Sequence, residues 1–108
     1  MYEYKEIYTI DFTDIKHYLD VHIKIKEALD FPDYYGCNWS AFWDCLTDML
    51  SDPIHIEIIG IEVLREKFKN SANMLIEILR DFKHCYNDRF SHKILIEVVE
   101  GDKRVVIE

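Results

Sequence analysis

The stretch that decides the fold is DYYGCNWSAFWDCLT, residues 33–47, in which a loop with two tyrosines and a glycine leads into a helix. When residues 38–50 are wound as a helix at about 100° per residue, the apolar side chains gather on one side. That inner side comprises Phe42, Cys45, Leu46, Met49 and Leu50. The outer side is polar and comprises Ser40, Asp44, Thr47 and Asp48, with Trp43 on the border. An exposed acid beside a large aromatic is typical of a recognition surface, because tight protein interfaces use aromatic anchors ringed by polar groups.

The rest of the chain alternates between strand-like and helix-like patterns. Strands are predicted over residues 2–10, 54–59 and 93–100, and helices over residues 15–29, 61–69 and 70–85. Asp11 or Thr13 is expected to cap the first helix, and Asn70 or Ser71 the last. The first helix shows an apolar stripe of Ile15, Tyr18, Leu19, His22, Ile25 and Leu29.

This order of elements requires crossovers between parallel strands, which place helices over the sheet. The sequence therefore predicts a single α/β domain over residues 1–108. Its core is a three-stranded parallel β-sheet packed with about four α-helices, and the pattern allows a short fourth strand near residues 105–107, paired as a hairpin.

The chain is acidic, with 13 Lys and Arg against 21 Asp and Glu in 108 residues and a net charge of −8. Nucleic-acid binding depends on counterion release by Lys and Arg, so this balance argues against it. A basic protein partner fits better, because opposite fields steer encounter. An acidic surface also serves solubility alone, so charge by itself leaves both readings open.

The cysteines and the N-terminus favour a reducing compartment. Cys37, Cys45 and Cys85 leave one thiol unpaired and form no CxxC motif, and residues 1–6 lack the features of a signal peptide. No apolar run is long enough to span a bilayer. The histidines show no ligand spacing, so we expect a cytoplasmic protein without a metal site or other cofactor.

The loop and the helix after it resemble the barstar family of intracellular ribonuclease inhibitors. The resemblance is carried by Tyr34-Tyr35-Gly36, by Asn38 and Ala41, and by Trp43-Asp44-Cys45-Leu46-Thr47, with Pro32 just before them. Arg80-Asp81 is similar to an Arg-acid step on the family's last helix, so the resemblance runs over residues 2–99. It implies the same order of strands and helices as predicted above.

The resemblance also implies a function. The chain would be a non-enzymatic immunity protein that neutralises a basic ribonuclease toxin in a 1:1 complex, without nucleic acid or membrane. Asp44 would occupy the place of a substrate phosphate in the cationic active site, with Trp43 beside it and Tyr34 against a catalytic histidine. The expected partner-binding residues are Tyr34, Gly36, Asn38, Ser40, Ala41, Trp43, Asp44, Thr47, Asp48 and Asp81.

The sequence departs from the family pattern at several positions. Ser40 stands where the family usually carries an acid, Asp48 where it carries a glycine and Met49 where it carries an aromatic residue, and residues 101–108 extend past the usual end. Two alternative functions stay open. One is an antitoxin of the same fold for a basic toxin domain that is not a ribonuclease, and the other is a small hydrolase using Asp44 and Asp81. From the residues alone, Gly36 is expected to be a turn glycine with positive φ whatever the function.

Overall fold

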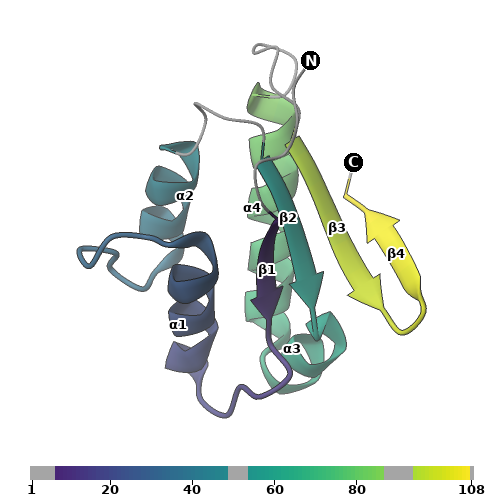
Figure 1. Cartoon of the computed structure of the whole chain (residues 1–108). Helices are drawn as coiled ribbons and strands as arrows, with labels where there is room; N and C mark the ends of the chain where they lie inside the picture. The colour runs from purple at the N-terminus through teal and green to yellow at the C-terminus, as the bar shows by residue number, and fades with distance from the viewer. Residues whose placement is uncertain (1–6, 49–53, 87–93, 108) are drawn as a thin grey trace.

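The computed structural model describes residues 7–48, 54–86 and 94–107, and it contains four strands and four helices within them (Figure 1). In chain order they are β1 (Ile7–Asp11), α1 (Tyr18–Leu29), α2 (Trp39–Thr47), β2 (Ile54–Ile59), α3 (Ile61–Lys67), α4 (Lys69–Tyr86), β3 (Ile94–Glu100) and β4 (Lys103–Val106). The predicted positions 2–6, 49, 50 and 93 lie outside the described residues.

The strands form one sheet in the order β1-β2-β3-β4. β1, β2 and β3 are parallel, and β4 pairs with β3 in the antiparallel direction. The α/β class, the three-stranded parallel sheet and the C-terminal hairpin predicted from the sequence are therefore confirmed. In Figure 1, α4 runs behind β1 and β2, while α1 and α2 lie next to one another beside β1.

The core is built from alternate residues of the strands. In β2, Ile54, Ile56 and Ile58 are buried while the residues between them are half-buried, and β3 follows the same alternation. Side chains in a strand point to opposite faces with a period of two, so the buried side chains of β2 and β3 share one apolar face. Phe42 of α2 and Phe82 of α4 are completely buried against it.

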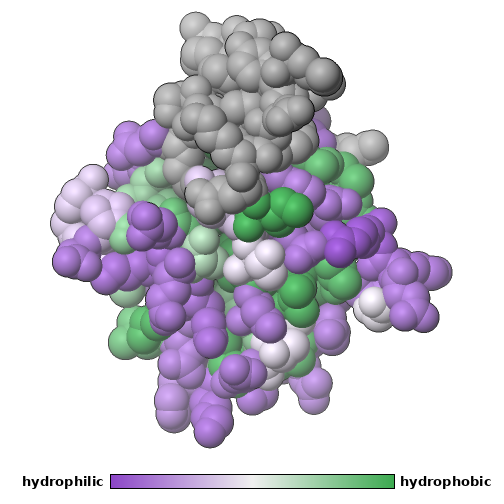
Figure 2. Space-filling view, viewed as in Figure 1, coloured by the Kyte–Doolittle hydropathy of each residue, from purple (hydrophilic) through white to green (hydrophobic). Residues whose placement is uncertain are grey.

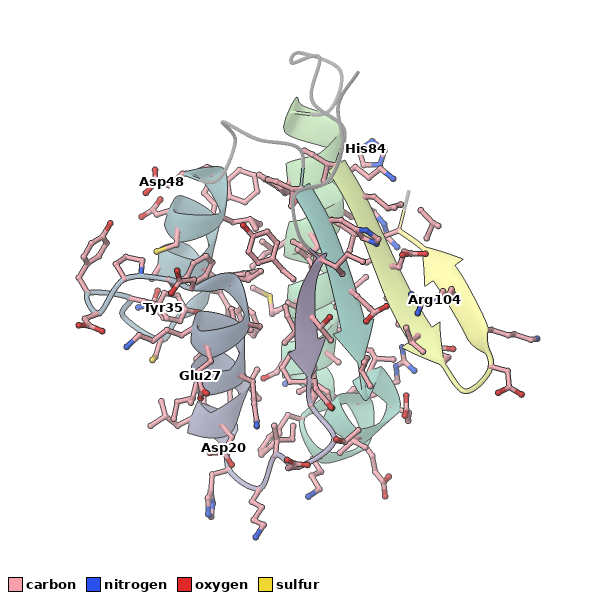
Figure 3. All side chains as sticks on the ribbon, in the orientation of Figure 1. Asp20, Glu27, Tyr35, Asp48, His84 and Arg104 are labelled. Carbon is pink, nitrogen blue, oxygen red and sulfur yellow. The ribbon has the colours of Figure 1, made fainter. Side chains whose placement is uncertain are left out.

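The opposite face of the sheet carries a polar cluster. Arg104 of β4 forms a hydrogen bond with Glu57 of β2 and lies 3.6 Å from Glu97 of β3. His55 Nε2 is 2.6 Å from Glu97 Oε1, and the Thr9 hydroxyl donates to Glu57 Oε1 at 3.2 Å. The arginine thus contacts both of the carboxylates that the register of β2 and β3 places side by side. Figure 3 shows Arg104 between β3 and β4, and Figure 2 shows hydrophilic residues interleaved with apolar patches on this view of the molecule.

The start of α1 differs from the prediction. Asp11 Oδ1 accepts hydrogen bonds from the backbone N–H and the hydroxyl of Thr13, at 2.9 and 2.7 Å, so it closes a local turn instead of capping a helix. The hydrogen bonds from Thr13 lower the pKa of Asp11. α1 begins only at Tyr18, with His17 as N-cap, and the Asp20 carboxylate accepts from the backbone N–H of His17. The prediction that Asp11 or Thr13 caps the first helix was therefore wrong, because short polar side chains form turns as readily as they cap helices.

The apolar stripe of α1 was also partly wrong. Tyr18 and Leu19 are 49% and 53% exposed, whereas Val21 and His22 in the next turn are completely buried. α1 starts at Tyr18, later than predicted, and the first two side chains of the helix lie outside the core. His22, Ile25 and Leu29 face inward as predicted.

The start of α4 is set by packing. α4 begins at Lys69, and the carbonyl of Phe68 accepts from the Ala72 N–H at 3.0 Å. Phe68 is half-buried against the core, while Ser71 lies within the first turn and is buried. The predicted cap at Asn70 or Ser71 was wrong, because the residue that precedes α4 is Phe68, an apolar residue that packs against the core.

Glycine is required where β2 passes into α3. Gly60 has φ of +81°, and a Cβ added there would lie 2.8 Å from the backbone nitrogen of Thr13. The chain after β1 therefore passes close against the end of β2, where the Phe12 N–H donates to the Ile59 carbonyl at 2.9 Å.

The C-terminal hairpin is fastened to the rest of the fold. Ile107 is buried, and its N–H donates to the carbonyl of Ile96 at 2.9 Å. The Lys83 ammonium group of α4 donates to the carbonyl of Ile107 at 2.7 Å. Residues 101–107 therefore belong to the folded structure.

Candidate functional site

The junction between loop and α2 is fixed by Asn38. Its side-chain oxygen accepts from the Ala41 N–H at 2.8 Å, which caps the helix, and its amide group donates to the Gly36 carbonyl at 3.3 Å. An Asn at this position satisfies one of the free backbone donors of the first turn. Asn38 and Ala41, both predicted as contact residues, thus have a structural role in setting the direction of α2.

The expected conformation of Gly36 was wrong. The left-handed backbone conformation is found at Cys37, with φ of +54°, and Gly36 does not adopt it. A Cβ at Gly36 would lie 3.1 Å from the Asn38 side-chain nitrogen. The glycine is therefore explained by its close approach to the capping side chain.

Beneath the loop lies a buried pair that sequence reasoning missed. Tyr35 is buried, and its hydroxyl oxygen lies 2.8 Å from Nδ1 of the completely buried His22. The ring of His22 also lies 4.6 Å from that of Trp39, so α1, the loop and α2 meet at this imidazole. Burial raises the pKa of Tyr35 and lowers the pKa of His22. The histidine within the apolar stripe of α1 was the available signal for this contact.

Next to this anchored residue, Tyr34 points outward. Its side chain is 78% exposed, the largest value among the exposed large hydrophobic residues of the described chain. The loop between Phe31 and Tyr35 is closed by a hydrogen bond from the Tyr35 N–H to the Pro32 carbonyl at 2.9 Å. The loop therefore buries one tyrosine and presents the other to solvent.

The predicted outer and inner sides of α2 are largely confirmed. Ser40, Asp44 and Asp48 are exposed, while Thr47 is half-buried and its hydroxyl donates to the Asp44 carbonyl at 2.9 Å. On the inner side, Phe42, Cys45 and Leu46 are buried. Burial raises the pKa of the Cys45 thiol, and the charges of Asp48 and Asp44 raise it further, so this cysteine is not an activated nucleophile.

A groove of about 460 Å³ runs between α2 and α4. It is lined by Trp39, Ser40, Trp43, Asp44, Met74, Ile78 and Asp81. Trp43 is half-buried and its ring meets that of Phe82 edge-on, with centroids 6.3 Å apart. Among the described residues, the lining contains two carboxylates and no lysine or arginine. Arg80, the neighbour of Asp81, lines a different pocket together with Arg65 and Glu77.

The structure brings four predicted residues together in the groove and leaves six outside it. Asp44 and Asp81, from different helices, line the same groove with Ser40 and Trp43. Tyr34, Gly36, Asn38 and Ala41 belong to the loop and the first turn of α2, and Thr47 and Asp48 to its other end. Figure 3 shows the distance along α2 between Asp48 and the loop at Tyr35. The groove also includes Trp39, Met74 and Ile78, which were not predicted.

In the part of the chain that the structure describes, no group of three His, Cys, Asp or Glu side chains could hold a metal ion. Over the same residues, no helix combines the length and the apolar composition that crossing a membrane requires.

Comparison with known proteins points to one family. The family model described as Barstar (barnase inhibitor) matches residues 6–97. A protein of Bacillus subtilis (strain 168) with the name "Putative ribonuclease inhibitor YrdF" is 34% identical over 88 residues, which cover 82% of this chain and 94% of that protein. β4 lies beyond the residues that the family model matches.

Proposed function

Because the chain belongs to the barstar family, described as barnase inhibitors, we propose that it neutralises a ribonuclease by covering the enzyme's cationic active site with the acidic surface of its loop and α2. The observation that carries this proposal is the placement of Asp44 and Asp81. Both carboxylates are exposed and line one groove that contains no compensating cation among the described residues.

Electrostatics favours such a partner. A ribonuclease must bind a polyanion, so its cleft is lined by cationic side chains. The net charge of −8 attracts such a cleft from a distance and raises the association rate. At contact, a carboxylate such as Asp44 accepts paired hydrogen bonds from an arginine, which are strong and directional.

Pre-organisation of the surface favours tight binding. Asn38 caps α2, and the hydrogen bond between Tyr35 and His22 holds the loop onto α1. Groups that are already fixed lose little conformational freedom on association, so more of the contact energy is available for binding. The exposed Tyr34 ring then supplies an aromatic contact from a loop that is anchored by its neighbour.

The predicted residues thus divide into two roles. We assign direct contact with the ribonuclease to the exposed or groove-lining side chains, which are Tyr34, Ser40, Trp43, Asp44, Asp48 and Asp81. We assign the shape of the surface to Gly36, Asn38, Ala41 and Thr47. A 1:1 complex follows, because one inhibitor surface would fill one active site.

The test is an inhibition titration with two enzymes: barnase, and the ribonuclease encoded nearest to the gene of this chain. We expect stoichiometric loss of RNA cleavage for at least one of them, and a much weaker effect for Asp44→Ala. Asp102→Ala is the matched control, since it removes the same charge from the exposed turn between β3 and β4. The proposal is wrong if neither enzyme is inhibited, or if the two variants behave alike.

The same experiment separates the alternative functions. Tight binding to a basic toxin domain that is not a ribonuclease, without inhibition of either ribonuclease, would favour the antitoxin function. Hydrolysis of a substrate by the purified chain alone, lost in Asp44→Ala, would favour an enzyme and contradict the inhibitor.

A further inference from the structure

The groove between α2 and α4 has two ends of different chemistry. Figure 1 shows the two helices side by side and running in the same direction. Trp39 and Met74 lie in the early turns of their helices, whereas Asp44 and Asp81 come five and seven residues later. At about 1.5 Å per residue, the acids are displaced from the apolar pair by roughly 7–10 Å along the helix axes.

The apolar end is accessible in the free protein. Met74 is 38% exposed, and Ile78, one turn further along the same face of α4, is half-buried. Trp39 is held on its inner side by the ring of His22 at 4.6 Å and by Phe42 at 5.8 Å, and it still lines the groove. This end therefore presents a firm aromatic wall opposite an adaptable thioether side chain.

We propose that this apolar end, formed by Trp39, Met74 and Ile78, is a specificity pocket that takes an apolar side chain of the ribonuclease. The inference rests on the proposed function and adds a second determinant to it. The carboxylates at the other end attract any cationic cleft, whereas an apolar pocket discriminates by shape among basic partners. An apolar side chain at the edge of the enzyme's cleft, seated here, excludes water from the neighbouring charge contacts and strengthens them.

Charge decides between this occupant and a second copy of the chain. A dimer through this groove would bring together two chains that each carry a net charge of −8, with the exposed carboxylates of Asp44 and Asp81 at the contact, and like charges oppose association. A ribonuclease offers cations for the acidic end and surface apolar groups for the other. The combination of both ends in one groove thus fits a basic protein with an apolar residue beside its active site.

The experiment measures Kd for Met74→Ala with whichever of the two ribonucleases the wild-type chain inhibits. We expect Kd to rise about tenfold or more, as for truncation of a buried anchor, chiefly through faster dissociation. Met74→Leu keeps an apolar side chain and should bind nearly as tightly as the wild type. Leu19→Ala is the matched control, because Leu19 is 53% exposed on α1 and does not line the groove.

Salt concentration distinguishes the two ends of the groove. The loss caused by Asp44→Ala should shrink as salt screens the charge contacts, whereas the loss caused by Met74→Ala should stay constant. If Asp44→Ala weakens binding and Met74→Ala does not, the pocket is refuted and the inhibitor proposal stands. If neither ribonuclease is bound, or neither variant weakens binding, both proposals fall.

Discussion

Replacing Tyr35 with phenylalanine removes one oxygen atom from the anchor of the binding loop. The hydroxyl lies 2.8 Å from His22 Nδ1, and the two residues are 5% and 0% exposed. His22 Nε2 is buried and has no hydrogen-bond partner among the described residues, so Tyr35→Phe leaves both nitrogens of the imidazole without a partner there. A buried polar group left unpaired costs about 1–3 kcal/mol. We therefore expect the free energy of unfolding to fall by about that amount, and Tm to fall by about 4–8 °C for each kcal/mol.

The assay is urea denaturation at pH 7.5 followed by far-UV circular dichroism, with thermal melts in parallel. Tyr34→Phe is the matched control, because it removes the same hydroxyl from a side chain that is 78% exposed, and surface changes of this kind stay within about 0.5 kcal/mol. The m-value should be the same for both variants. If Tyr35→Phe is as stable as Tyr34→Phe, the buried hydrogen bond does not hold the loop and the reasoning is refuted.

Three further predictions concern stability. Because burial holds the pKa of His22 below its ordinary value of about 6.5, the unfolded chain takes up this proton first as pH falls, so the free energy of unfolding should decrease below about pH 6.5. Urea titrations between pH 7.5 and 5 measure this, and His22→Gln should flatten the dependence; an unchanged slope would exclude His22 as its source. Phe42→Ala should cost about 3–5 kcal/mol, since Phe42 is completely buried behind the binding face of α2, and a calorimetric loss below 1 kcal/mol would contradict the packing. Ile107→Ala should cost about 2–5 kcal/mol if the hairpin is part of the core, while a wild-type urea midpoint would show that residues after β3 are dispensable.

The sequence predicted the elements whose patterns are long and regular. The β-branched run over residues 54–59 predicted β2, and the spacing of Phe42, Cys45 and Leu46 identified the buried face of α2, because period determines which side chains share a face. The order of these elements then led to the parallel sheet.

The errors came where a local rule competed with another local structure or with tertiary packing. Asp11 has a side chain typical of a helix cap, yet it closes a turn with Thr13. α4 starts directly after Phe68, whose ring packs against the core. At Asp11 two local structures compete, because its partner Thr13 is only two residues away and the same side chain suits a turn or a helix end. At α4 the outcome depends on core residues that are distant in sequence, which propensity does not show.

The candidate site was predicted only in part for the same reason. Asp44 and Trp43 are close in sequence and were found together, and the family resemblance supplied Asp81. The groove itself needs α2 and α4 to lie side by side, and nothing within α4 alone shows that Met74 and Ile78 face Trp39. The contact between His22 and Tyr35 likewise joins two segments whose meeting is decided by the fold.

The central claim is that a carboxylate on α2 occupies the catalytic centre of a ribonuclease. A crystal structure of the complex with the inhibited enzyme tests it most directly. We expect the Asp44 carboxylate within about 2.7–2.9 Å of arginine or lysine nitrogens inside the enzyme's cleft, the range for a hydrogen bond between charged groups. A complex in which Asp44 faces bulk solvent and the catalytic residues remain open would contradict the account.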